Sequence, residues 1–334
     1  MSQEDSIASR KGEHIKWCLD PHSQGLVEPF SNIIVPYKSL PEIDMHQVDT
    51  SVKLFGKQLS QPLIISSMTG GTKHGIDINT NLAKAAESEK IAIGVGSQRI
   101  ALEKPAAVET FKVIRKYAPT AFVFANMGAV QLNYGYTAKE YQKVIDMIQA
   151  DALYLHINPL QEAVQPEGDT DWRGLIDKIA EVVKRVDVPV VVKEVGHGID
   201  TETAKALLQV GVSGLDVAGV SGTSYAWVEA KRARNQDFAN WFKDIGIKTE
   251  DAINQLASIK SERTILIASG GLRSPVQGYK AKMCGADFYA STQPFLDAAL
   301  KNSEEVVREI QNWQKGLQIT QFVSGKKTWE SISS

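Results

Sequence analysis

Residues 264–275 read TILIASGGLRSP, and residues 286–291 read ADFYAS. The first stretch is a short apolar run, rich in β-branched residues, that ends in a glycine turn. Pro275 follows at a position suited to the start of a helix. The second stretch is another short apolar run, after an interval long enough for one helix. Together they predict a strand, a turn, a helix and a second strand parallel to the first.

The same alternation extends back through most of the chain. Six further apolar runs occupy residues 62–66, 91–95, 121–125, 152–157, 189–192 and 214–218. Stretches with helical spacing lie at residues 79–90, 105–117, 138–149, 172–186 and 201–209. Near-continuous apolar runs are typical of parallel strands that helices cover on both faces. Eight successive strand-then-helix units predict an α/β protein, a (β/α)8 TIM barrel.

A doubly wound parallel sheet is the alternative fold for such a pattern. Its nucleotide site would be marked by Gly-x-Gly-x-x-Gly after the first strand, and no such motif follows residues 62–66. Residues 94–99, GVGSQR, follow the second run but lack the third glycine. The barrel is therefore the favoured interpretation.

Three segments lie outside the eight units. Residues 1–60 form an N-terminal extension, whose basic pair Arg10-Lys11 is either a solvated tail or an arm that clamps a polyanionic substrate at the barrel mouth. We expect the barrel at residues 61–314, with a long insertion after the sixth strand at 225–262, and a C-terminal tail at 315–334. An insertion of this length at the carboxyl end of a barrel strand is usually a lid or an assembly surface.

The composition of the chain narrows the function classes. With 37 basic and 39 acidic residues the net charge is −2, which gives no reason to expect a nucleic-acid or anionic-membrane surface. Cys18 and Cys284 form neither a disulfide framework nor a metal-ligand spacing. No stretch approaches the length of a membrane-spanning apolar segment, and the first residues do not resemble a signal peptide. We therefore expect a cytoplasmic enzyme.

In a TIM barrel the active site is built from residues that directly follow the strands. After the seventh strand, Gly270-Gly271 lets backbone amides approach an anion, and Arg273 adds a forked, permanently charged donor. The loops after strands seven and eight are the usual phosphate site of this fold. These residues predict a bound phosphate group, with a glycine turn and a surface arginine as the alternative.

Lys193 ends the fifth apolar run with a positive charge. In the barrel mouth its ammonium could pair with an anionic cofactor ring, such as a reduced flavin, which carries negative charge near N1. A structural ion pair with a neighbouring carboxylate is the alternative.

Four further polar residues end or follow the fourth strand. His156 and Asn158 share one face of the strand by its two-residue period, so both can reach the barrel mouth. Gln161 and Glu162 come shortly after. Carboxylate oxygens are ligands that Mg2+ prefers, usually together with substrate phosphates, although one glutamate is a weak indication. A hydrogen-bonded structural role remains the alternative for His156.

Eight short motifs occur in the chain in a fixed order. They are Arg10-Lys11-x-Glu13-His14, Ser67-Met68-Thr69-Gly70-Gly71, Gly94-x-Gly96-Ser97-Gln98-Arg99, Ala125-Asn126-x-Gly128, His156-x-Asn158-x-x-Gln161-Glu162, Lys193-Glu194-Val195-Gly196, Gly222-Thr223-Ser224-x-x-Trp227 and Ser269-Gly270-Gly271-x-Arg273. In this combination the chain resembles the type 2 isopentenyl-diphosphate isomerases, an FMN-dependent family, from about residue 9 to about residue 300. The long segment after Trp227 departs from the resemblance.

The resemblance implies the interconversion of isopentenyl diphosphate and dimethylallyl diphosphate in isoprenoid biosynthesis. It also implies FMN, a reductant such as NADPH to produce reduced flavin, Mg2+, and a homo-oligomer, either a tetramer or an octamer.

The resemblance further implies roles for single residues. Those that would bind the diphosphate substrate are Arg10, Lys11, Arg99, His156 and Asn158, with Gln161 beside the reacting carbons. Those that would hold FMN are Ser67, Met68, Thr69, Ser97, Asn126, Lys193, Thr223, Gly271, Arg273, Ala290 and Ser291. Glu162 would hold Mg2+, and the candidates for catalytic roles are Gln161, His156 and Lys193.

Moving a double bond requires a proton to be added at one carbon and removed from another. No side chain in this set forms an obvious acid–base pair over an apolar isoprenyl group. Reduced FMN with a proton at N5 is therefore one candidate acid and base, with Lys193 tuning the charge of the flavin. Gln161 as a proton relay is the other candidate.

Three other functions are alternatives at the level of sequence. An FMN-dependent 2-hydroxy-acid oxidase would need a histidine and an arginine after the sixth strand or later, and residues 217–225, VAGVSGTSY, contain neither. A nucleotide dehydrogenase of this fold would need a cysteine in the same loop, which also has none. A non-catalytic flavin sensor would not need Arg10-Lys11, Arg99 and Glu162.

Overall fold

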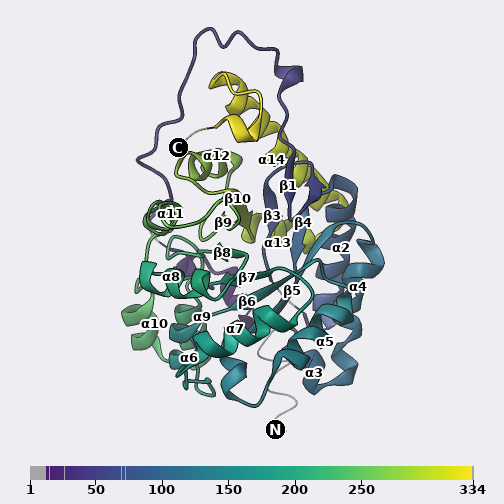
Figure 1. Ribbon diagram of the computed structural model, residues 1–334, viewed down its shortest axis with the longest axis vertical. Coiled ribbons are helices and arrows are strands. Elements are labelled where there is room, and N and C mark those ends of the chain that lie inside the picture. The colour runs from purple at the N-terminus through teal and green to yellow at the C-terminus, as the bar shows by residue number, and fades with distance from the viewer. Residues whose placement is uncertain (1–12, 15, 26, 69, 72, 333–334) are drawn as a thin grey trace.

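The computed structural model describes residues 13–14, 16–25, 27–68, 70–71 and 73–332. Eight parallel strands close into a barrel in the order β10-β3-β4-β5-β6-β7-β8-β9. The strands are β3 (Leu63–Ile65), β4 (Ala92–Gly94), β5 (Phe122–Gly128), β6 (Ala152–His156), β7 (Val190–Lys193), β8 (Gly214–Asp216), β9 (Ile265–Ala268) and β10 (Phe288–Ser291). Each of the eight predicted runs overlaps one of these strands, so the predicted TIM barrel is confirmed (Figure 1).

Helices surround the barrel (Figure 1). The longer ones are α2 (Lys73–Glu89), α4 (Glu109–Tyr117), α5 (Ala138–Ile148), α7 (Leu175–Arg185), α8 (Thr201–Gln209), α9 (Tyr225–Arg232), α11 (Thr249–Ala257), α12 (Pro275–Met283) and α14 (Ser303–Val323). Shorter helices are α3 (Arg99–Glu103), α6 (Pro159–Val164), α10 (Gln236–Phe242) and α13 (Gln293–Ala299), and 3-10 turns are η1 (Pro21–Ser23), η2 (Met45–Gln47), η3 (Pro105–Ala107), η4 (Ala129–Asn133) and η5 (Trp329–Ser331). The helix predicted at Pro275 begins there, with the Ser274 side chain accepting from the Gln277 amide.

The strands form because nearly all of their residues are buried. All seven residues of β5 and all four of β7 are buried, including Lys193 at the end of β7. Such strands suit a barrel whose interior is filled with side chains and whose outer face is covered by helices. The charged residue at the end of β7 therefore lies inside the molecule, where it needs partners.

Three features lie outside the predicted strand and helix pattern. An antiparallel hairpin of β1 (Val52–Leu54) and β2 (Lys57–Leu59) lies within the N-terminal extension. Residues 225–262 contain α9 and α10, which pack on each other, and α11, which packs on α8 and β9. The boundary expected at residue 315 falls inside α14, which packs against α2, α12 and α13. Within the described residues, no helix has both the length and the apolar character needed to cross a membrane.

The strand register brings residues from distant parts of the chain to one level. Gly128 of β5 pairs with His156 of β6, His156 with Lys193 of β7, and Lys193 with Asp216 of β8. Paired residues of parallel strands point to the same face, so these side chains are neighbours at the carboxyl end of the barrel. The active site of this fold is expected at that end.

Candidate active site

A cavity of about 440 Å³ opens at the carboxyl ends of the strands, and residues that end or follow all eight of them line it. The predicted site residues among its lining are Ser67, Met68, Ser97, Arg99, Asn126, His156, Asn158, Gln161, Glu162, Lys193, Thr223, Gly271, Arg273, Ala290 and Ser291. Arg10, Lys11 and Thr69 lie outside the described residues. The cavity therefore gathers every predicted site residue that the structure describes.

The loop after β9 turns on two glycines. Gly270 and Gly271 have φ angles of +98° and +88°, a region that residues with a side chain rarely adopt. A Cβ on Gly271 would lie 2.2 Å from the carbonyl oxygen of Ser221, and one on Gly222 would lie 2.7 Å from the Gly271 nitrogen. Because these backbones pack directly on each other, the loop leaves main-chain atoms at the cavity wall.

Gln24 connects this loop to the one after β8. Its Oε1 accepts a hydrogen bond of 2.8 Å from Nη2 of Arg273, and its Nε2 donates to Oγ1 of Thr223 at 3.0 Å. The amide of Gly25 also donates to the carbonyl of Gly222 at 2.7 Å. The N-terminal segment is thus part of the cavity wall, and the Arg273 guanidinium is aimed by a side chain that no sequence motif predicted.

Lys193 places a positive charge at the floor of the cavity, and its ammonium group contacts two side chains. Nζ of Lys193 lies 3.2 Å from Oδ2 of Asp216 and donates to Oγ of Ser269 at 3.4 Å. The ion pair considered as an alternative for Lys193 is therefore present, and Lys193 also lines the cavity. The structural ion pair with Asp216 therefore does not exclude a contact between Lys193 and a cofactor ring.

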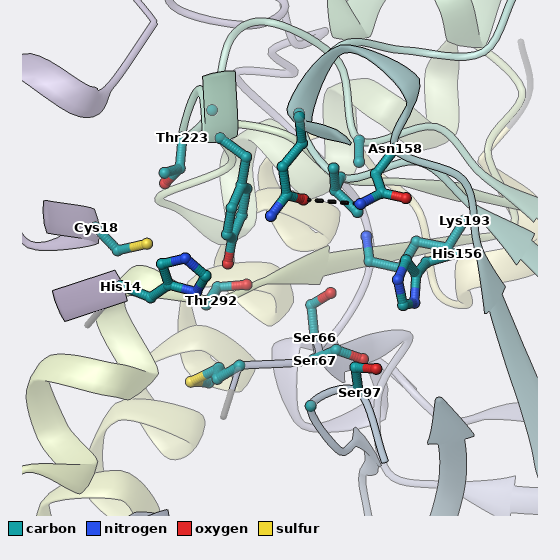
Figure 2. Close-up of a pocket in the computed structure, with 18 of the residues that line it drawn as sticks. His14, Cys18, Ser66, Ser67, Ser97, His156, Asn158, Lys193, Thr223 and Thr292 are labelled. Atoms are coloured by element: carbon teal, nitrogen blue, oxygen red, sulfur yellow. Dashed lines mark hydrogen bonds between the residues drawn. The ribbon is translucent and has the colours of Figure 1, made fainter. Parts of the chain in front are cut away.

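His156 lies beside Lys193 in the close-up of the cavity (Figure 2). Burial, together with the charge of Lys193, lowers the pKa of His156 to about 4, so the ring is neutral near pH 7. Nδ1 of His156 is 2.9 Å from Oδ1 of Asn126, and Nδ2 of Asn126 donates to the Val95 carbonyl. Because Asn126 offers its oxygen, we assign the proton to Nδ1, which leaves Nε2 of His156 as an acceptor.

Asn158 orients the two residues that follow it on α6. Its Nδ2 donates to Oε1 of Gln161 at 3.1 Å, the bond drawn at Asn158 in Figure 2, and to Oε1 of Glu162 at 2.9 Å. The other carboxylate oxygen of Glu162 accepts from the backbone amide of Asp169 at 2.8 Å. Oδ1 of Asn158 has no hydrogen-bond partner among the described residues.

The Gln161 amide is fixed from its other end by a buried glutamate. Nε2 of Gln161 donates to Oε1 of Glu229 at 3.0 Å, while Nε2 of His14 is 2.9 Å and Nη1 of Arg232 2.6 Å from the same carboxylate. Burial alone would raise the pKa of Glu229, but these hydrogen bonds and charges outweigh it and lower the pKa to about 2. Glu229 is therefore a permanent anion that orients its neighbours.

Arg99 faces the same part of the cavity. Its Nη1 is 2.7 Å from Oδ2 of Asp169, and its Nε is 2.7 Å from Oε1 of Glu103. The side chain keeps 39% of its surface exposed. A forked guanidinium held in this way, at the edge of a cavity, is suited to bind a phosphate group.

The donor set fits FMN. The glycine loop, with Arg273 and the start of α12, forms an anion cradle. Ser67, whose hydroxyl is buried and without a hydrogen-bond partner among the described residues, lies with Ser66 and Ser97 opposite Lys193 (Figure 2). An unsatisfied buried hydroxyl in an open cavity is suited to hydrogen-bond a ligand. For Mg2+, Glu162 is a suitable oxygen ligand, but the described residues contain no group of three or more histidine, cysteine or acidic side chains that could hold a metal alone.

Several cavity residues were not predicted. Five of them lie outside the strand ends that directed the predictions, or belong to no recognisable motif. They are Gln24, Gln131, Gln165, Glu167 and Arg232. Asp216 pairs with Lys193 but does not itself line the cavity formed by the described residues; it could have been predicted, because a charged residue inside the apolar run 214–218 is unusual for a buried strand. Cys18 also lines the cavity, and burial raises the pKa of its thiol to about 12, which disfavours the thiolate that a nucleophile needs.

Comparison with known structures agrees with the fold. The structure of flavocytochrome b2 with sulfite bound has a TM-score of 0.71 and 16% identity, and covers 98% of this chain and 83% of that chain. A mandelate oxidase with benzoyl-formic acid has a TM-score of 0.66 and 13% identity, and covers 98% and 94% respectively. At such low identity these likenesses show a shared barrel fold alone.

Comparison with curated sequences goes further. Isopentenyl-diphosphate delta-isomerase from Nostoc sp. is 46% identical over 307 residues, covering 90% of this chain and 87% of the relative. The protein of the same name from Rickettsia canadensis is 43% identical and covers 100% and 98%. The family model of FMN-dependent dehydrogenases matches residues 135–334. The chain therefore belongs to the isopentenyl-diphosphate delta-isomerase family and carries the barrel of the FMN-dependent dehydrogenases.

Proposed function

We propose that the protein interconverts isopentenyl diphosphate and dimethylallyl diphosphate with FMN bound in the cavity. The observation that carries the proposal is the division of one cavity into two chemically different halves. One half has the glycine loop after β9, with Arg273 and Lys193, and the other has Arg99 with the group around Glu162. A cofactor phosphate and a substrate diphosphate would thus each have a separate set of donors.

The cofactor half uses the residues around the glycine loop. Gly271, Arg273 and Ser291 would hold the phosphate of FMN, and Ser67, Ser97 and Asn126 its ring, with Lys193 on the ring's anionic side. When bound in its reduced form, FMN supplies a proton donor and acceptor at N5 for the isomerisation. NADPH is the reductant we propose for generating that form, since the isomerisation itself has no net redox change.

The substrate half would bind the diphosphate through Arg99 and Asn158, with Arg10 and Lys11 from the N-terminal arm. Glu162 would hold Mg2+ against the diphosphate. This ion usually joins one or two carboxylates to phosphate oxygens and water, so a single protein ligand is sufficient.

Gln161 would lie beside the isoprenyl carbons. Both ends of its amide are committed, the oxygen to Asn158 and the nitrogen to Glu229. A neutral amide held in this way is a weak acid and a weak base, so we assign it the positioning of the substrate rather than the transfer of a proton. Glu229 takes part by holding the Gln161 amide in its orientation.

An isomerase assay tests the proposal. The purified protein, supplied with FMN, NADPH and Mg2+ under anaerobic conditions, is expected to convert isopentenyl diphosphate to dimethylallyl diphosphate with NADPH consumed only once per flavin. Size measurement in solution tests the homo-oligomer that we also propose. Oxidation of 2-hydroxy acids without isomerisation, or a protein that takes up no FMN, would contradict the proposed function.

A further inference from the structure

A carboxylate lies beneath the floor of the cavity. Asp216 ends β8 and is fully buried. The cavity that the described residues form is lined by Lys193 and Ser269 but not by Asp216. A buried carboxylate is costly unless it is paired and hydrogen-bonded, so the partners of Asp216 indicate what it does.

Ser269 fixes one oxygen of this carboxylate. Its hydroxyl accepts from the backbone amide of Ala218 at 3.1 Å and from Nζ of Lys193 at 3.4 Å. Both of those partners are donors, so the single proton of the hydroxyl goes to its third partner, Oδ1 of Asp216. The other oxygen, Oδ2, lies 3.2 Å from Nζ of Lys193. Asp216 thus accepts a hydrogen bond at Oδ1 and forms an ion pair with Lys193 through Oδ2.

Glu194, which follows Lys193 in the chain, is a buried carboxyl that accepts hydrogen bonds from the amides of Val195 and Gly196, and burial raises its pKa to about 7. The titratable side chains on β6 at this level are neutral. His156, which pairs with Lys193 in the strand register, is uncharged near pH 7. Tyr154 lies two residues before it on β6, and burial and the charge of Asp216 raise the pKa of its hydroxyl well above the usual value. The ammonium of Lys193 and the carboxylate of Asp216 therefore offset each other beneath the cavity.

We propose that Asp216 offsets the charge of Lys193 and thereby limits how strongly the site favours reduced FMN. The inference rests on the proposed FMN site. A cation near N1 favours the anionic reduced flavin over the neutral oxidised one. A carboxylate on the far side of the same cation weakens that preference. Asp216 is a positioning residue in this sense, because it acts through Lys193 and does not face the cavity.

The midpoint potential of bound FMN tests this offset, measured anaerobically against a reference dye and without substrate. Asp216→Asn is expected to shift the equilibrium about tenfold toward reduced FMN, which is about 30 mV for a two-electron couple. Lys193→Met is expected to shift it about tenfold in the opposite direction. Asp151→Asn is the matched control, because Asp151 also pairs with a lysine, Lys57 at 3.0 Å, but precedes β6 at the other end of the barrel.

An unchanged potential in Asp216→Asn with FMN bound would overturn the offset. A lowered potential would also overturn it, because the carboxylate would then serve only to hold the ammonium in place. If Asp216→Asn retains no FMN, the smaller Asp216→Ser is measured with the same expectation. If neither does, Asp216→Glu decides: FMN bound at the wild-type potential supports a role for the charge, and loss of FMN overturns it. These measurements of the midpoint potential need no isomerase activity, so a failure of the offset can be distinguished from a failure of the proposed function.

Discussion

At the scale of single residues, Glu162 has the clearest chemical requirement. A hard cation needs the charge of a carboxylate, and an amide of the same shape lacks it. We expect Glu162→Gln to lower isomerase activity at least tenfold and to raise the Mg2+ concentration needed for half-maximal rate, with FMN still bound. Titration of activity with Mg2+ measures this. Glu167→Gln is the control, since Glu167 also lines the cavity but is largely exposed; the same change in both variants would contradict a specific role for Glu162.

The lowered pKa of His156 predicts that the free energy of unfolding decreases in acid. Its pKa is about 4 in the folded protein and about 6.5 in an unfolded chain. As the pH falls from about 6.5 to about 4, the unfolded state therefore binds a proton that the folded state does not, and folded stability is lost over that interval. Above about pH 6.5 this contribution is constant.

The variant His156→Asn removes this titration while keeping a similar shape. We expect it to lose about 2 kcal/mol less free energy of unfolding than the wild type between pH 7 and pH 5. Urea unfolding of both proteins at the two pH values, without FMN, measures the difference. Equal losses would show that the pKa of the ring does not differ between the folded and unfolded protein.

At the scale of elements, the loop after β9 depends on its glycines for two separate reasons. Gly271 and Gly135 share a φ of +88°, but a Cβ on Gly135 would meet nothing within 4 Å. Gly135→Ala is therefore expected to cost only the left-handed strain, about 1 kcal/mol of stability. Gly271→Ala adds a collision with Ser221 and should weaken FMN binding more than tenfold, which titration of the flavin absorbance measures. Similar FMN affinity in the two variants would mean that the close packing is not needed.

The eight barrel strands could be predicted because each is an apolar run bounded by turn residues, and burial on both faces leaves that mark in the sequence. The hairpin of β1 and β2 leaves no comparable mark, since each strand has three residues and a polar residue in the middle. The long helix α14 was missed for a related reason. Its apolar positions are spread among polar residues, so the pattern favoured a tail after residue 314.

The candidate site was predictable only where the fold itself directs residues to one place. Lys193 and Ser291 end barrel strands, so recognising the barrel was enough to place them at the cavity. Gln24 reaches Arg273 across 249 positions, and Gln161 reaches Glu229 across 68. Such contacts depend on how loops and the N-terminal segment pack, and the hydrophobic pattern of a sequence carries no information about that packing.

At the scale of the whole molecule, the N-terminal segment completes the cavity that the barrel begins. His14 approaches Glu229, Gln24 bridges Thr223 and Arg273, and Trp17 packs on Trp227. These contacts attach residues far from the barrel in sequence to both halves of the proposed site. Binding of cofactor and substrate should therefore depend on a segment that contributes no barrel strand.

Trp17 allows the dependence of substrate binding on this segment to be tested. Its ring meets that of Trp227 edge to face, with centroids 6.1 Å apart, and joins the N-terminal segment to α9. Such a pair contributes about 0.5–1.5 kcal/mol beyond its buried area.

Arg10 and Lys11 precede Trp17 by only a few residues, so weakening this attachment should weaken the diphosphate contacts that we assign to them. We expect Trp17→Ala to raise KM for isopentenyl diphosphate about tenfold, with a smaller effect on kcat and none on the affinity for FMN. Trp241→Ala is the matched control, because Trp241 lies on the neighbouring α10 with 64% of its surface exposed and should leave KM unchanged. A rise in KM of equal size in both variants would mean that the insertion as a whole, rather than the attachment of the N-terminal segment, governs substrate binding.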